Sequence, residues 1–416
     1  MSEQQPPEPP SEPPAARQEE FPSEGSVTGV QALYDRLGGV LIPAAAAFLA
    51  FLIGGIVVLI TEKSIAAPFQ AYQAIFQGTG LTWFIPFVGD TAQEARDLQQ
   101  TLLITTPLIL TGIAVAFAFR CGMFNIGGQG QYWVGLLTAI WVGTSLDGMP
   151  RPLHIVIALA AAIFAGAIWG GIAGLLKATT GAHEVISTIM LNWIALWVGK
   201  WLLEAPDGFL QGTDPALPRS SDVLASAQLP QIWGRLQPLH AGIFIALFAL
   251  VVYHLLLNRT TLGYEVRAVG FNPDAAAYGG INVKRSYFLA LAIAGSFAGL
   301  AGAVDLLGWK YRLTSTEFDA NLLGFVGIAV ALLGRNKAVG ILLAALLFGA
   351  LEVGTSPRQL DPSIFNPELA TNLATMIQAL IIAFVGAEFL ILSIWGARKR
   401  IGFPGVGSRV KPELRA

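Results

Sequence analysis

The chain has 416 residues, of which 54% are hydrophobic and only 12% are charged, and its formal net charge is -2 at pH 7. Water-soluble domains carry about a quarter charged residues, so this composition excludes an ordinary soluble protein and predicts an all-α, polytopic transmembrane helical bundle. The single cysteine excludes an internal disulfide and a cysteine metal cluster, and the four histidines lack metal-ligand spacing. No metal site is predicted.

The first 28 residues are rich in Pro, Glu and Ser. Such a segment cannot bury enough apolar surface to fold, and it lacks the basic start of a signal peptide. We therefore expect a disordered tail over residues 1–28, a transmembrane domain over 29–400, and a second polar tail over 401–416.

About ten apolar segments follow, and ten spans would place both termini on one side of the membrane. With the N terminus inside, the inner segments hold 16 Lys and Arg residues and the outer segments hold 8. The positive-inside rule then makes both termini cytoplasmic and turns the polar segments 61–100 and 204–239 outward. The predicted spans are 39–60, 102–119, 132–146, 153–176, 185–203, 241–257, 287–307, 322–333, 339–353 and 373–395.

A polar stretch, residues 258–286, separates the sixth and seventh predicted spans. Its middle predicts a short helix, in which Asn272 is the N-cap, Pro273 takes the first position, and Gly279 and Gly280 end the helix. A capped helix with basic flanks between two spans is typical of a cytoplasmic docking element. An interfacial loop helix without a partner is the alternative that the residues leave open.

A glycine-rich turn between the second and third spans runs from Phe124 to Gln131. Irregular backbone at membrane depth is tolerated only where it lines a cavity or is buried in protein. The amides of Asn125, Gln129 and Gln131 suit a neutral polar ligand with hydroxyl, amide or nucleobase groups. The turn therefore indicates either a broken helix at a substrate site or a tight turn that packs helices closely.

Two further polar features lie within predicted spans. Asn192, beside Trp193, must find a hydrogen-bonding partner or face a substrate path. Glu388 is the one deep acid, whereas a proton or cation relay needs several, which argues against an ion-coupled carrier. The phosphate-binding Gly-Lys-Ser/Thr loop is absent from the sequence, so this chain is not expected to hydrolyse ATP, and no catalytic residue is predicted.

Four stretches, in this order, carry a resemblance to a known family. Over about residues 100–400 the chain resembles bacterial ABC-transporter permeases. The nearest branch is the nucleoside and simple-sugar importers, related to the ribose and branched-chain amino acid permeases. The stretches are 119–131 (FRCGMFNIGGQGQ), 184–192 (EVISTIMLN), 268–278 (AVGFNPDAAAY) with 280–284 (GINVK), and 327–336 (GIAVALLGRN).

The resemblance implies a permease subunit of the bacterial cytoplasmic membrane that is not an enzyme and binds no cofactor. ATP and Mg²⁺ would belong to a partner ATP-binding subunit. The other implied partners are a second permease subunit, either a paralogue or another copy, and an extracytoplasmic substrate-binding lipoprotein. No nucleic acid partner is implied.

The resemblance also implies that the polar stretch couples the permease to the ATPase. The expected coupling residues are Glu265, Arg267, Gly270, Asn272, Pro273, Ala276, Tyr278 and Gly280. The expected substrate-pathway residues are Phe124, Asn125, Gln129, Gln131, Asn192 and Trp193. The main hypothesis is a nucleoside importer, followed by a simple-sugar importer. An ion-coupled carrier that acts alone and a scaffold subunit without a pathway remain alternatives.

Overall fold

The structure is a computed structural model that describes residues 29–84, 91–205, 208–212, 217–233, 239–320, 322–356 and 367–386. The chain divides into two compact units, Met1–Leu41 and Ile42–Ala416. The described backbone of the first unit, residues 29–41, is helical. Three predicted features lie outside the described residues, namely the tail at 1–28, the acid Glu388 and the tail at 401–416.

Helices form nearly all the regular structure of the described residues, which otherwise hold two isolated β-bridges. The helices are α1 (Gly29–Glu62), α2 (Ala67–Gly78), η1 (Leu81–Phe84), α3 (Thr91–Arg120), α4 (Gly128–Ser145), α5 (Arg151–Thr180), α6 (Glu184–Glu204), α7 (Gly242–Arg259), α8 (Thr261–Phe271), α9 (Pro273–Tyr278), α10 (Val283–Asp305), η2 (Leu306–Lys310), α11 (Glu317–Ala320), α12 (Leu323–Leu333), α13 (Ala338–Gly354) and α14 (Pro367–Gly386).

Each of the ten predicted spans overlaps a helix, so the helical prediction is confirmed for their described residues; residues 387–395 of the last span lie outside the described part of the chain. In the described part of the chain, six helical segments are long and apolar enough to cross a membrane, and they lie in α1, α3, α5, α6, α7 and α10 with η2. Helix α13 and residues 372–386 of α14 are shorter apolar helices. The multi-pass character is therefore clear, while the count of ten spans and the cytoplasmic termini stay predictions.

Helix α10 packs against α3, α4 and α5, and glycines bring it closest to α5. A Cβ on Gly166 would lie 2.3 Å from the carbonyl oxygen of Gly295, and a Cβ on Gly295 would lie 2.1 Å from that of Gly166. Four residues further along α10, a Cβ on Gly299 would lie 2.4 Å from the carbonyl oxygen of Ala162. Small residues at this spacing let two membrane helices bring their backbones into contact.

The described part of segment 204–239 is hydrogen-bonded to η2 and to the residues that follow it. The Leu229 N–H donates to the carbonyl oxygen of Leu307 at 2.8 Å, and the Val223 N–H donates to that of Tyr311 at 2.7 Å. A segment predicted to be an outer polar loop is thus tied to the end of α10.

His240, which follows this segment, is buried beneath η2. Its Nδ1 accepts a hydrogen bond from the Gly242 N–H at 3.1 Å, and a Cβ on Gly308 would lie 2.1 Å from its Nε2. Burial lowers the pKa of His240 to about 4, although the nearby Asp305 carboxylate opposes that shift. The imidazole is therefore neutral at pH 7.

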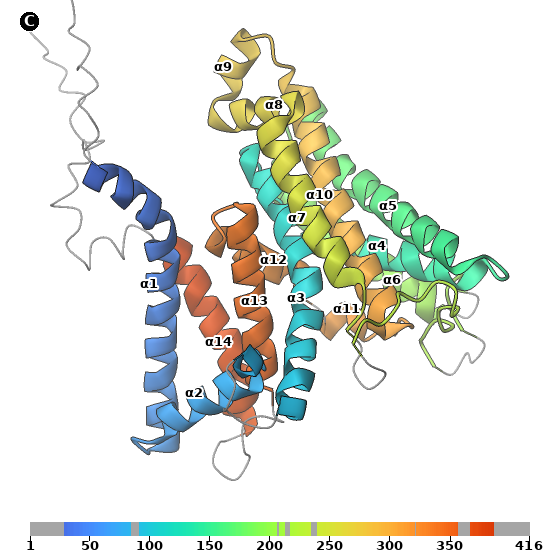
Figure 1. Ribbon diagram of the computed structural model, residues 1–416. Coiled ribbons are helices and arrows are strands. Elements are labelled where there is room, and N and C mark those ends of the chain that lie inside the picture. The colour runs from blue at the N-terminus through green and yellow to red at the C-terminus, as the bar shows by residue number, and fades with distance from the viewer. Residues whose placement is uncertain are drawn as a thin grey trace, which may run out of the picture. The chain divides into compact units, whose positions relative to one another are not determined.

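The two ends of α10 carry different elements (Figure 1). Helices α8 and α9 stand at its upper end, together with the end of α7, whereas α11 lies at its lower end. The 23 residues of α10 span about 35 Å at 1.5 Å per residue, close to the thickness of the apolar core of a bilayer. We refer to these ends as the α9 end and the η2 end.

Candidate functional site

Helix α9 has a defined start and a defined stop. The side-chain oxygen of Asn272 accepts hydrogen bonds from the N–H groups of Asp274 at 2.9 Å and Ala275 at 3.0 Å, and Pro273 occupies the first turn. After the helix, Gly280 has a φ of +85°, a conformation that favours glycine. The predicted capped helix is confirmed.

A second helix, α8, precedes α9, although no helix is predicted there from the polar composition. The Thr260 hydroxyl caps it by accepting from the Gly263 N–H at 3.1 Å. Val266 and Val269 are buried on its inner face. A threonine cap followed by apolar residues at helical spacing is the signal that could have revealed α8. We call α8 and α9 together the docking element.

The docking element packs closely against the turn after α3. A Cβ on Gly270 would lie 2.3 Å from the carbonyl oxygen of Arg120, so a larger residue would separate the two segments. The Arg120 guanidinium donates to the carbonyl oxygen of Asn336 at 3.0 Å, and the Tyr253 hydroxyl donates to the same oxygen at 2.8 Å. A displacement of α8 would therefore reach α3, α7 and the turn between α12 and α13.

Aromatic side chains on the docking element face outward. Phe271 is 93% exposed and Tyr278 is 97% exposed, one at each end of α9, and Tyr264 on α8 is exposed as well. Exposed aromatic rings on a rigid backbone are typical of the residues that dominate protein–protein binding energy. Tyr278 is a predicted coupling residue, whereas Tyr264 and Phe271 are not, although both are aromatic residues within a polar stretch.

Of the remaining predicted coupling residues, Gly270, Asn272, Pro273 and Gly280 are exposed, whereas the other three are partly or wholly buried in the element. Glu265 and Arg267 are half-buried, and the Arg267 Nε donates to the carbonyl oxygen of Gly263 at 3.2 Å. Ala276 is the buried residue of α9, and its carbonyl oxygen accepts a hydrogen bond from the Ile281 N–H at 3.0 Å. These residues hold the shape of the element, while the exposed rings form its outer surface.

Only the first half of the predicted glycine-rich turn is a turn: residues 121–127 join α3 to α4, whereas residues 128–131 form the first turn of α4. The side-chain amides of Asn125 and Gln131 exchange two hydrogen bonds, of 3.1 Å and 3.2 Å, and both side chains are buried. The Asn125 oxygen also accepts from the Gly127 N–H at 3.0 Å. The first turn of α4 is thereby fixed to the junction that precedes it.

Two more predicted amides tie this turn to other helices. The Gln129 side-chain oxygen accepts from the Gly324 N–H of α12 at 2.7 Å. Asn192 of α6 accepts from the Gly130 N–H at 2.7 Å and donates to the carbonyl oxygen of Ile126 at 2.9 Å. We call Asn125, Gln129, Gln131 and Asn192 the amide network. In this conformation the side chains of all four members bind protein atoms.

The two predicted aromatic pathway residues are exposed and lie apart from the network's hydrogen bonds. Phe124 packs on Phe119 with 5.0 Å between ring centroids. Trp193 lies on the exposed face of α6, together with Trp197 and Trp201. The structure thus brings the four amides together without bringing Trp193 to them.

Cys121 lies at the start of the same junction and is buried. Its sulfur is 3.8 Å from the carbonyl oxygen of Ser286, at the start of α10. Burial raises the pKa of the thiol to about 12, so the reactive thiolate is scarce at neutral pH.

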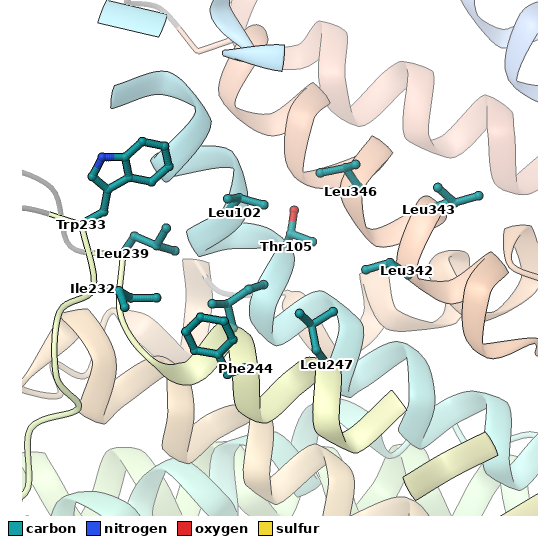
Figure 2. A pocket seen from close by; sticks show the side chains of 11 residues that line it. Leu102, Thr105, Ile232, Trp233, Leu239, Phe244, Leu247, Leu342, Leu343 and Leu346 are labelled. Carbon is teal, nitrogen blue, oxygen red and sulfur yellow. The ribbon is translucent and has the colours of Figure 1, made fainter. Parts of the chain in front are cut away.

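A cavity of about 550 Å³ lies between α3, α7, α13 and the segment before α7 (Figure 2). Leu102, Phe244 and Leu343 are among its apolar side chains, and Trp233 forms one edge. The Thr105 hydroxyl on its wall donates to the backbone of its own helix. The cavity therefore suits hydrocarbon rather than a polar solute.

The apolar helices, the glycine contacts between α5 and α10, and the capped helices α8 and α9 define a multi-pass helical membrane protein. A family described as the permease component of branched-chain amino acid transport systems matches residues 98–388, which is most of the chain. The chain belongs to this permease family.

Three curated relatives are similar along most of their length. The guanosine ABC transporter permease protein NupP of Bacillus subtilis is 39% identical over 88% of this chain and 99% of its own. The nucleoside ABC transporter permease protein NupB of Lactococcus lactis is 35% identical, over 85% and 92%. The glucose ABC transporter permease protein TsgB13 of Haloferax volcanii is 33% identical, over 75% and 80%.

Bacillus subtilis and Lactococcus lactis each have a second permease with the same description as the first. These second permeases are less similar to this chain, at 28% identity in Bacillus subtilis and 25% in Lactococcus lactis. No solved structure matches the chain.

Proposed function

We propose that the chain is the permease subunit of an ATP-driven ABC importer for nucleosides in a bacterial cytoplasmic membrane. The observation that carries this proposal is its similarity to a guanosine permease over 88% of this chain and 99% of the relative. A similarity of that extent includes both the membrane helices and the docking element, so it reaches beyond a shared apolar composition.

In this proposal the docking element binds the ATP-binding subunit, which supplies the ATPase activity and holds ATP and Mg²⁺. Phe271 and Tyr278 insert into that subunit, because their rings stand free of this chain and flank a helix fixed by its caps. The permease itself is not an enzyme and binds no cofactor.

Movement of the ATPase reaches the substrate path through Gly270, whose backbone contact with Arg120 leads into the α3–α4 junction. A shift of this junction moves the first turn of α4 and separates Gln129 from the Gly324 backbone. The amide network then exposes neutral donors and acceptors to a nucleoside. The same shift, reversed, closes the path.

The second permease subunit is a paralogue rather than another copy of this chain. Bacillus subtilis and Lactococcus lactis each have two such permeases, and in both cases this chain is more similar to one of the two. Different subunits on the two sides of a path suit an asymmetric solute such as a nucleoside.

The extracytoplasmic binding lipoprotein delivers substrate at the η2 end. The basic residues of the chain favour the α9 end as the cytoplasmic one, which turns segments 61–100 and 204–239 outward. Since the described part of 204–239 is hydrogen-bonded to η2 and the residues after it, docking of the lipoprotein would act directly on the end of α10.

A simple-sugar importer is the second candidate, and the 33% identity to a glucose permease supports it. A nucleoside contains a sugar ring, so hydroxyl-binding groups serve either solute. The nucleobase is what distinguishes the two proposals.

The test is uptake of radiolabelled guanosine and of radiolabelled glucose, by cells with the complete transporter and by the same cells without this chain. We expect deletion of the chain to abolish transporter-dependent guanosine uptake and to leave glucose uptake unchanged. Loss of glucose uptake alone would favour the sugar candidate. Undiminished uptake of both would contradict the proposal.

A further inference from the structure

A cavity of about 270 Å³ lies at the η2 end of α10, where four elements meet. Its walls come from Leu103 and Pro107 of α3, Trp309 of η2, Glu317 of α11 and Leu323 of α12. Ligand pockets usually measure about 300–1,000 Å³, so this cavity lies at the lower end and leaves room for no more than one compact ligand. Unlike the larger apolar cavity, this one has charged walls.

Three charged side chains meet on one wall of the cavity. The Lys310 ammonium lies 3.0 Å from the Asp305 carboxylate and 2.6 Å from the Glu317 carboxylate. Asp305 and Lys310 are almost fully buried, and the Tyr132 hydroxyl donates to Asp305. Two carboxylates share one ammonium, so the cluster carries one excess negative charge.

Charged groups in a membrane protein are costly to bury, and they commonly mark the path of a substrate or an ion. Here they stand beside η2, a single π-helical turn of the kind found often at functional sites. Glu317 keeps 31% of its side chain exposed, so its carboxylate can accept a hydrogen bond from a ligand while it pairs with Lys310.

Trp309 supplies an aromatic wall of fixed orientation. Its indole N–H donates to Asp305 at 2.7 Å, while 37% of the residue remains exposed. The Lys310 ammonium lies over the ring, 5.6 Å from its centroid, and Trp309 is among the residues that line the cavity. Stacking on an aromatic side chain is a general way to bind a nucleobase.

Helix α3 forms another wall of the same cavity, next to a break in its own hydrogen-bond ladder. Pro107 has no N–H, so it cannot make the regular helical hydrogen bond to the carbonyl oxygen of Leu103. Both residues line the cavity.

We propose that this cavity is an outer substrate subsite, in which the base of a nucleoside stacks on Trp309 and its N–H or hydroxyl groups donate to Glu317. This inference rests on the proposed nucleoside transport. The excess negative charge repels phosphate, so the subsite accepts nucleosides and rejects nucleotides.

The position of the subsite fits a two-stage path. Leu323 lines the cavity, and the next residue, Gly324, donates its N–H to Gln129 of the amide network. The start of α12 therefore stands between the subsite and the network. The shift that releases Gln129 also moves one wall of the cavity, which passes the nucleoside from the subsite to the network.

The first experiment is photolabelling of membranes that carry the assembled transporter. The probe is radiolabelled 8-azidoadenosine, and labelled peptides of this chain are mapped by mass spectrometry. We expect label on the peptides that contain Leu103 to Pro107 or Trp309 to Glu317. Excess guanosine should prevent the labelling, and guanosine monophosphate should not. Label confined to other peptides would overturn the proposal.

The second experiment uses Trp309→Leu and Glu317→Gln, with uptake measured at saturating binding protein. Trp309→Leu should lower the maximal uptake rate about tenfold through the loss of stacking. Glu317→Gln should let guanosine monophosphate compete for labelling, because it removes the excess negative charge. The matched control is Trp233→Leu, since Trp233 is 38% exposed but lines the apolar cavity.

The outcomes separate this inference from the proposed function. A wild-type transporter that takes up no nucleoside contradicts the proposed function itself. A wild-type transporter that takes up guanosine, with both variants unchanged in rate and in competition, contradicts only the subsite. If Trp309→Leu does not assemble, the result with Glu317→Gln, which preserves shape, decides the question.

Discussion

The two ends of α10 use the same kinds of side chain in opposite ways. At the α9 end the rings of Phe271 and Tyr278 stand in solvent, and the backbone beneath them is fixed by caps. At the η2 end Asp305 and Lys310 are buried, and the Trp309 ring is fixed by a hydrogen bond to a charge. An end with exposed rings suits a protein partner, whereas an end with enclosed charges suits a small polar solute.

The largest expected effect comes from removing the exposed rings of the α9 end. The double variant Phe271→Ala with Tyr278→Ala should weaken binding of the ATP-binding subunit about a thousandfold, because each such residue contributes about 2 kcal/mol or more. Co-purification and ATP-dependent uptake would measure the loss, while photolabelling at the η2 end should persist. Phe248→Ala, which removes an exposed ring from α7, is the control. Full ATPase binding by the double variant would contradict the docking assignment.

The next effect concerns the helix that joins the two ends. Gly295→Leu would force α10 away from α5, since a Cβ there already meets the Gly166 backbone. We expect a destabilisation of about 3 kcal/mol and loss of both ATPase binding and nucleoside labelling. Thermal unfolding of the purified complex would measure it. Ala160→Leu, on the exposed face of α5, is the control and should leave the melting temperature nearly unchanged.

A third effect tests the buried imidazole at the η2 end. In the folded state the pKa of His240 is about 4, below its ordinary 6.5. Between pH 6.5 and pH 4, therefore, the imidazole binds a proton in the unfolded chain but not in the folded chain. Stability is therefore fully present above pH 6.5 and falls by about 2 kcal/mol between pH 7 and pH 5.

The melting temperature measured at pH 7, 6 and 5 would report this loss, and His240→Gln should flatten that part of the profile. The exposed His254 provides the matched variant, His254→Gln, which should keep the wild-type pH dependence. An identical slope in the wild type and in His240→Gln would contradict the assignment.

The smallest effect probes the end of α9. Proline cannot adopt the φ of +85° found at Gly280, so Gly280→Pro should tilt α9 and lower ATPase association about tenfold. Gly280→Asn is the control, because asparagine tolerates this conformation, and it should bind nearly as well as the wild type. Equal binding by all three proteins would show that the orientation of α9 does not matter.

The sequence predicts local features of this chain better than distant contacts. The cap and the stop of α9 depend on neighbours in the chain, so Asn272, Pro273 and Gly280 reveal them directly. The amides at 125, 129 and 131 are recognisable as unusual, but their partners Asn192 and Gly324 come from other helices. Sequence patterns contain no information on which helix supplies such a partner.

The charged cluster at the η2 end shows the same limit more sharply. From the sequence alone, Asp305 is predicted to lie near the end of a span, and Lys310 is predicted to belong to the outer segment that follows. A π-helical turn brings residue 310 over residue 305, since its hydrogen bonds join positions five apart. No helical periodicity in the sequence indicates that turn, and α11 adds Glu317 from beyond it.

The buried state of Cys121 makes this chain a convenient subject for chemical mapping. It is the one cysteine in the sequence, and its enclosed, protonated thiol reacts slowly with maleimides at neutral pH. Cysteines introduced singly along α3, η2 or α12 would therefore be modified above a low background, with no native residue replaced first. Their labelling rates, with and without ATP, would follow the opening of the path in the otherwise unaltered protein.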